Sequence, residues 1–115
     1  MTLKEAYESV ESNYDNVLKR LGSEGMIKRF AVKFIDDPTF GELKNALAAG
    51  DGESAFRAAH TMKGICLNLG FDKLYEVSAA LTEQLRGYEI TGSEAVYQQV
   101  VEQYDRLMAA IKAID

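Results

Sequence analysis

The chain is a succession of amphipathic segments separated by glycine, and this pattern limits the folds open to it. Apolar residues recur three and four positions apart along most of the 115 residues, as in an α-helix with one buried face. No stretch shows the sustained alternation of a β-strand. Glycines fall between the periodic segments, at Gly22 and Gly25, Gly50 and Gly52, Gly70, and Gly87 and Gly92. The sequence therefore predicts an all-α protein.

Short connections between long helices favour antiparallel neighbours, so we expect an antiparallel up-and-down four-helix bundle. The expected helices are Ser23–Ala49 (broken near Pro38), Asp51–Leu69, Phe71–Arg86 and Ser93–Ile114. The residues before them are expected to form additional short helices across one end of the bundle. Residues 1–115 are then a single domain, with the N-terminal cap helices in 1–22 and the bundle in 23–115.

The helix starts carry residue types that cap helices. Thr2, with Glu5 three residues later, fits a capping box. Asp37 followed by Pro38 fits an N-cap and the first helical position. Asp72 is expected to cap the helix that follows it.

Composition and charge argue against several classes of function. The net charge of −5 is unfavourable for a nucleic-acid partner, because phosphate backbones select basic surfaces. No apolar run approaches the roughly 20 residues that span a bilayer, and the N-terminal residues lack the pattern of a secretory signal. The single cysteine fits a reducing compartment. We expect a cytoplasmic protein and a monomer, without a membrane or nucleic-acid partner.

The only histidine, His60, stands in an unusual local sequence. Lys63 and Gly64 follow three and four positions later, so both lie one helical turn beyond it. A glycine inside a helix lowers the stability of that helix by about 0.5–1 kcal/mol relative to alanine, so the presence of Gly64 needs an explanation. An imidazole beside an ammonium group and bare backbone suits a histidine that carries an anion and is approached closely by another macromolecule.

A helical wheel of the same helix separates its core stripe from the face that carries His60. The stripe comprises Ala55, Ala59, Met62, Cys66 and Leu69. His60 and Gly64 lie outside it, flanked by Phe56, Arg57 and Leu67. The sequence therefore predicts that His60 is at least partly exposed, with a small apolar patch at its edge.

The segment from Ala58 to Gly70 resembles the signature of histidine-containing phosphotransfer (HPt) domains. Its pattern is a histidine followed by lysine three, glycine four and a second glycine ten positions later. Residues 34–38, the turn at 49–51 and the helix at 71–86 are also similar to the family, so the resemblance covers the chain from about residue 14. The full spacing, in an all-helical chain of this size, makes the signal specific.

The resemblance implies a phosphorelay intermediate that has no ATP site of its own. His60 would accept a phosphoryl group on Nε2 and pass it to or from an aspartate of a response-regulator receiver domain. Lys63 would stabilise the phosphate, and Gly64, Phe56, Arg57 and Leu67 would form the docking surface. The receiver would bring its own Mg²⁺, so no cofactor of this chain is expected. A histidine kinase or hybrid kinase is the other implied partner.

One position departs from the family pattern. Many members place a glutamine or glutamate on the adjacent helix, where it bonds the second ring nitrogen of the histidine. By spacing, the matching residue is Thr82, with Glu83 next to it and Arg86 one turn further. Threonine is short, so this contact is expected to be weaker, water-mediated or made by a neighbour. Arg86 is a candidate second cation for the phosphate.

Other interpretations stay open beside this one. The chain could be an HPt module from a larger hybrid or chemotaxis kinase, or a helical interaction module that never carries phosphate. A general-base role for His60 has less support, because no carboxylate lies at helical spacing from it. A metal site is not expected, because the one histidine and Cys66 point to different faces. Cys66 is expected to be a buried small hydrophobe.

Overall fold

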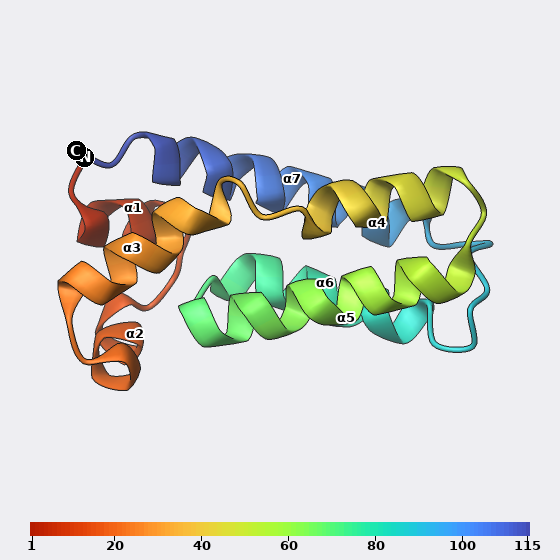
Figure 1. Cartoon of the computed structure of the whole chain (residues 1–115), viewed down its shortest axis with the longest axis horizontal. Helices are drawn as coiled ribbons and strands as arrows, with labels where there is room; N and C mark the ends of the chain where they lie inside the picture. The colour runs from red at the N-terminus through yellow and green to blue at the C-terminus, as the bar shows by residue number, and fades with distance from the viewer.

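The computed structural model describes all residues, 1–115, and contains helices and no strands. The helices, in chain order, are α1 (Leu3–Ser9), α2 (Tyr14–Leu21), α3 (Glu24–Phe34), α4 (Thr39–Ala48), α5 (Gly52–Leu69), α6 (Asp72–Gln84) and α7 (Glu94–Lys112). The prediction of an all-α helical bundle is confirmed. Figure 1 shows an elongated molecule, and its principal extents are 40 × 23 × 20 Å.

The bundle consists of four helical rods, one of which is broken. α3 and α4 follow one another along the same rod, and the break lies between Phe34 and Thr39, where the sequence places Pro38 (Figure 1). α5 packs against α4 and α6, and α6 packs against α7. Aromatic stacking joins α4 to α7, because the ring centroid of Phe40 lies 3.9 Å from that of Tyr104, with the two planes 5° apart. Both termini meet at the end that carries α1–α3.

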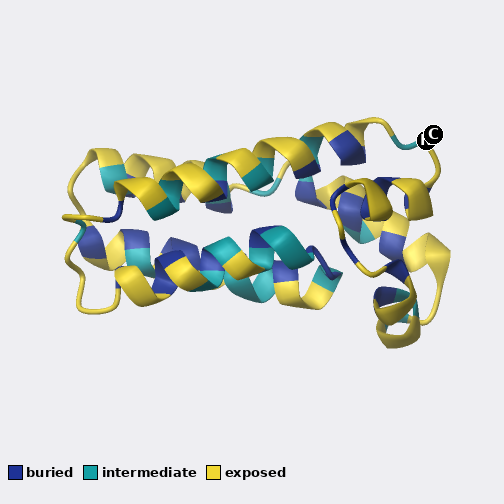
Figure 2. Cartoon of the chain, turned by 180° about the vertical axis from the view of Figure 1, so that it is seen from behind, coloured by how far each residue is buried: buried dark blue, intermediate teal, exposed yellow.

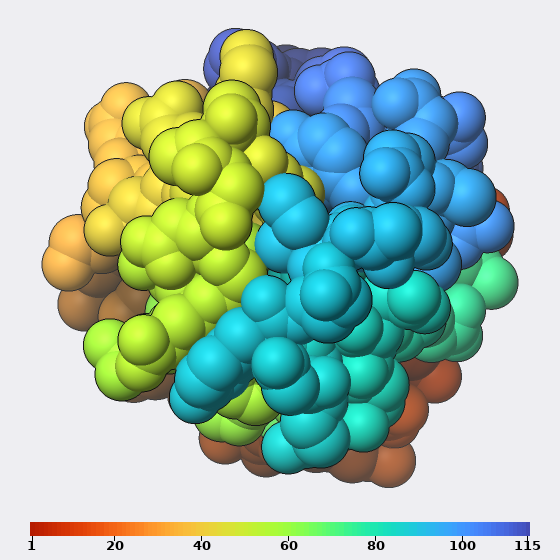
Figure 3. Space-filling view, turned by 90° about the vertical axis from the view of Figure 1, so that its right-hand side faces the viewer, coloured from red at the N-terminus to blue at the C-terminus, as the bar shows by residue number.

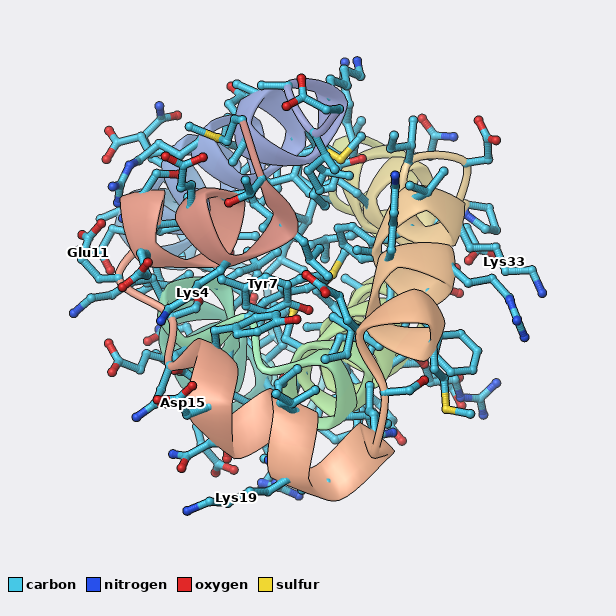
Figure 4. The ribbon with its side chains drawn as sticks, turned by 90° about the vertical axis from the view of Figure 1, so that its left-hand side faces the viewer. Lys4, Tyr7, Glu11, Asp15, Lys19 and Lys33 are labelled. Carbon is cyan, nitrogen blue, oxygen red and sulfur yellow. The ribbon has the colours of Figure 1, made fainter.

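The short helices α1 and α2 close one end of the bundle, and they donate hydrogen bonds to two of the last carbonyls of α5. The Tyr7 hydroxyl donates to the carbonyl of Leu69 at 2.7 Å. Arg20 Nη2 donates to the carbonyl of Asn68 at 3.3 Å. Figure 4 looks onto this end and shows Tyr7 near its centre, whereas Lys19 and Lys33 lie at the rim. The carbonyls in the last turn of a helix have no donor within the helix, and Tyr7 and Arg20 supply donors to two of them.

Two of the expected caps differ from the structure. The Thr2–Glu5 capping box is confirmed. α4 begins one residue later than expected, so Pro38 is the N-cap, while the Asp37 carboxylate still accepts a hydrogen bond from the Thr39 amide at 2.8 Å. The prediction that Asp72 caps its own helix was wrong.

The cap of α6 comes instead from the N-terminal segment. Ser12 Oγ accepts the Asp72 amide hydrogen bond at 3.1 Å, and the Asp72 carboxylate accepts a hydrogen bond from the Asn13 amide at 3.0 Å. The two segments therefore cap each other, and hydrogen bonds from backbone amides to side-chain oxygens fix the closing segment to the bundle, in addition to apolar contact.

The core runs between the facing sides of the helices, where Figure 2 shows the buried residues. On α5 the predicted stripe is buried except for Leu69, which is half-buried, and Ala58 joins it. At the C-terminus of α5, Gly70 adopts φ +71°, and a Cβ added there would overlap the Cγ2 atom of Val17. Val17 is fully buried on α2, so this glycine lets α2 pack directly against the end of α5.

Candidate functional site

α5 holds His60 on its exposed side, and the caps of this helix fix its position. The Asp51 side chain accepts a hydrogen bond from the Ser54 amide at the N-terminus, and Gly70 ends the helix in the left-handed conformation. The predicted exposure of His60 is confirmed. Its imidazole forms no hydrogen bond or salt bridge with any other side chain of α5 or with α6. Both ring nitrogens are therefore free to meet a group that approaches from solvent.

Gly64 leaves an open stretch of backbone one turn beyond His60. A Cβ built at this position meets no atom within 4 Å outside the helix's own local backbone. Packing inside the bundle therefore gives no reason for a glycine at this position. The close approach of another macromolecule, expected from the sequence, stays a prediction.

Lys63 supplies a cation that is not consumed by an ion pair. The structure contains five salt bridges, and none of them involves Lys63. Its charge acts on Glu83 of α6 without forming a salt bridge. Hydrogen bonds from Arg86 lower the pKa of the Glu83 carboxyl, and the charges of Arg86 and Lys63 lower it further. The Lys63 ammonium group is thus not held in a salt bridge within the chain.

Arg86 lies on the same side of the molecule but is engaged by two neighbours. Its guanidinium donates two hydrogen bonds to Glu83, from Nε at 3.0 Å and from Nη2 at 2.7 Å. The guanidinium carbon also lies 5.4 Å from the ring centroid of Phe56, in cation–π geometry. Both side chains of this ion pair are largely exposed, so the pair contributes little to stability.

Phe56 is the centre of an aromatic group that adjoins His60. The centroids of the Phe56 and His60 rings are 6.2 Å apart, and those of Phe56 and Tyr88 are 5.8 Å apart. Leu67, with 51% of its surface exposed, adds apolar area on α5. Arg57 is exposed and forms an i,i+4 ion pair with Glu53 at 2.7 Å. We call the exposed face formed by Phe56, Arg57, His60, Lys63, Gly64 and Leu67 the His60 surface.

Thr82 does not reach this surface. It is fully buried, and its hydroxyl donates to the Ser78 carbonyl of its own helix at 2.7 Å. No hydrogen bond joins Thr82 to His60, so the direct contact weighed from the sequence is absent here. The exposed α6 residues near the site are its neighbour Glu83 and, just past the end of the helix, Arg86.

Metal-ligating side chains and the single cysteine are the other possible sites in the sequence. The structure contains no group of three or more histidine, cysteine, aspartate or glutamate side chains that could hold a metal ion. Cys66 is buried in the core as expected, and burial raises the pKa of its thiol. None of the helices combines the length and apolar character needed to cross a bilayer.

The family model described as "Hpt domain" matches residues 37–114, which include α4–α7 and every residue of the His60 surface. The chain belongs to the HPt domain family. HPt domains take part in phosphotransfer in phosphorelay signalling, where they interact with kinases and response regulators of two-component systems. They are phosphocarrier modules without a catalytic site of their own. No curated protein and no solved structure matches the chain closely enough to support a relationship.

Sequence reasoning on this HPt domain missed two exposed residues beside the site. Glu83 was noted only as a neighbour of Thr82, although its i,i+3 spacing to Arg86 is that of a helical ion pair. No sequence pattern points to Tyr88. Its proximity to Phe56 depends on the path of the loop between α6 and α7, and no residue pattern marks that path.

Proposed function

We propose that His60 is the phosphoacceptor of this HPt domain and exchanges its phosphoryl group with an aspartate of a receiver domain. The proposal rests on three features that lie together on the exposed side of α5. They are the only histidine, His60, the lysine Lys63, which forms no salt bridge, and Gly64, where no side chain covers the backbone. Phosphotransfer through a histidine needs an imidazole that a partner can reach, and the chain has a single one.

The chemistry requires little from this chain beyond a neutral imidazole. The lone pair of Nε2 attacks the phosphorus of an aspartyl phosphate, and a nitrogen–phosphorus bond forms. The phosphorus–oxygen bond to the aspartate breaks, and its electron pair stays on the carboxylate oxygen. The proton on Nδ1 remains there during transfer to His60, and the reverse step restores the neutral ring. The new negative charge lies one helical turn from Lys63.

The partner supplies the remaining groups. No carboxylate accepts a hydrogen bond from His60, and the chain has no cluster of metal-ligating side chains. The aspartate and the Mg²⁺ that neutralise charge during transfer belong to the receiver in this proposal. The chain acts as a carrier between a kinase-linked donor and a response regulator.

The direct test is incubation of the chain with a panel of phosphorylated receiver domains. We expect at least one receiver to transfer phosphate to this chain, and the label to be stable in base and labile in acid, as a phosphoramidate bond requires. Mass spectrometry of the labelled peptide should place the phosphate on His60. Label confined to a hydroxyl or carboxylate side chain would contradict the proposal.

Lys63→Ala should shorten the life of the phosphorylated state. Removing the ammonium takes away a cation one turn from the phosphate, and charge-assisted contacts of this kind contribute roughly 1.5–3 kcal/mol. Solvent screens the charge of this half-exposed lysine and reduces that contribution. We therefore expect the transfer rate or the phosphohistidine lifetime to fall by about two- to tenfold. Lys44→Ala, at an exposed lysine on α4, is the control. Equal lifetimes in both variants would make Lys63 a surface charge only.

Gly64→Gln should raise stability and lower transfer from a receiver. Glutamine is the better helix former, and its Cβ meets no atom within 4 Å, so unfolding free energy should rise by a few tenths to about 1 kcal/mol. The longer side chain should obstruct a receiver at His60, whereas a small phosphoramidate donor should still label the ring. Urea unfolding and both transfer assays measure these effects.

The matched control for Gly64→Gln is Gly41→Gln. Gly41 also lies inside a helix, on α4, and a Cβ there meets nothing within 4 Å. The control should gain similar stability and keep full transfer. Unimpaired transfer by a well-folded Gly64→Gln variant would remove docking as the reason for this glycine.

A further inference from the structure

The loop between α6 and α7 holds one residue in a conformation that its residue type disfavours. Tyr88 has φ +67°, and it follows Gly87 at φ +100°. The left-handed region costs a non-glycine residue about 1–2 kcal/mol, so a tyrosine there marks local strain. Its side chain is 51% exposed, so burial of the ring does not compensate for that strain. Strained residues of this kind are concentrated at functional sites.

A close contact with the start of α5 fixes the path of this loop. The Tyr88 amide donates to the Leu85 carbonyl at 2.8 Å, which ties the loop to the end of α6. On the other side, the Tyr88 carbonyl lies against Gly52, and a Cβ at Gly52 would overlap it. Gly52 is the first residue of α5 and is buried. Figure 3 shows this end of the molecule, with the loop after α6 lying against the α4–α5 turn.

This path brings the Tyr88 ring to the edge of the His60 surface. The Tyr88 ring lies 5.8 Å from that of Phe56, at an interplanar angle of 58°. The Phe56 ring lies 6.2 Å from the imidazole of His60. An exposed tyrosine therefore lies two ring contacts away from the phosphoacceptor. Tyr88 lies in the loop after α6, whereas every residue of the His60 surface lies on α5.

We infer that Tyr88 is a docking residue for the receiver domain, and that Gly52 positions it. The inference rests on the proposed function of His60. A specific interface covers about 800 Å² on each partner, which corresponds to a disc of roughly 16 Å radius. A receiver whose aspartate meets His60 at bonding distance centres that disc on the imidazole. The distances from His60 to Phe56 and from Phe56 to Tyr88 are each well below this radius, so the docked receiver covers Tyr88.

The residue type supports a role in affinity. Tyrosine is enriched among interface residues that contribute most to binding, because it adds a large rigid area with a polar tip. The Tyr88 ring is already oriented before docking by the loop and by Phe56, so little side-chain entropy is lost when a partner covers it. Receivers with an apolar contact opposite Tyr88 should therefore be preferred over receivers with a charge at that point.

The test uses Tyr88→Gly and Tyr88→Asn, which remove the ring and keep residues that tolerate positive φ. The phosphodonor is the receiver that labels the wild-type chain fastest. We expect its KM to rise roughly 5- to 30-fold in both variants, with kcat changed less than about twofold. Labelling by phosphoramidate should be unchanged, because the small donor needs no docking. Val32→Ala, at an exposed apolar residue on α3, is the control and should leave KM unchanged.

Gly52→Ala gives an independent measurement, because it displaces the loop and keeps the tyrosine. A folded Gly52→Ala variant should show the same rise in KM. Unchanged KM in the two Tyr88 variants, with wild-type transfer intact, would overturn the docking role alone. Failure of every receiver to label the wild-type chain would overturn the proposed function and this inference with it. A parallel loss of kcat and of phosphoramidate labelling would assign Tyr88 a structural role instead.

Discussion

His60→Gln is expected to abolish acceptance of phosphate and to leave the bundle folded. His60 is exposed, lies outside the core stripe of α5 and forms no hydrogen bond with its helix neighbours, so the fold loses no contact with it. Glutamine is a good helix former of similar length, and its amide nitrogen has no nucleophilic lone pair. Because the chain has no other histidine, no alternative acceptor of the same chemistry is available.

The measurement compares base-stable label on the variant and the wild type with the same phosphorylated receiver and with phosphoramidate. Circular dichroism and thermal unfolding check that the variant is folded, and the two midpoints should agree within a few degrees. Base-stable, acid-labile phosphate that persists on the variant would show that a group other than His60 is the acceptor.

Gly70→Ala is expected to destabilise the fold strongly and to leave the His60 surface untouched. Two costs add there. Alanine at φ +71° costs about 1–2 kcal/mol, and forcing a methyl against the fully buried Val17 costs a further 1–3 kcal/mol. The expected loss is about 2–5 kcal/mol, a large share of the 5–15 kcal/mol that stabilise an ordinary domain.

Gly50→Ala separates these two costs. Gly50 has the same φ of +71°, but a Cβ there meets nothing within 4 Å. It should therefore lose only the conformational part, about 1–2 kcal/mol. Urea unfolding of both variants measures the difference, which reports the contact with Val17. Equal losses would mean that α2 shifts away from α5 at little cost and does not pack rigidly on it.

The parts of the fold that depend on one segment at a time were predictable from the sequence. Apolar periodicity gave each long helix to within a few residues of its bounds, and the Thr2–Glu5 and Asp51 caps are local to their own helices. The exposed position of His60 followed from the wheel of α5 alone. Side chains on one helix keep fixed angular relations, so a face can be derived without knowledge of the partners.

Features that join distant segments were not predictable in this way. The cap of α6 comes from Ser12, sixty positions earlier in the chain, and no spacing rule connects the two. Thr82 was placed near His60 by spacing, but spacing does not fix the rotation of α6 against α5. The structure turns its hydroxyl to Ser78. The position of Tyr88 depends on the left-handed backbone of its loop, and this backbone packs against Gly52, which lies far away in the sequence.

Under the proposed function, the placement of the single phosphoacceptor ring on one side of a narrow rod has a kinetic consequence. A donor and an acceptor must each bring a reacting atom to the same imidazole, and each covers most of the same face. They cannot be bound together, so the carrier must release the first before the second arrives. Initial rates should then follow ping-pong kinetics, with parallel double-reciprocal lines. An excess of unphosphorylated acceptor should inhibit the relay by occupying the empty carrier, so flow through it depends on the ratio of the two partners.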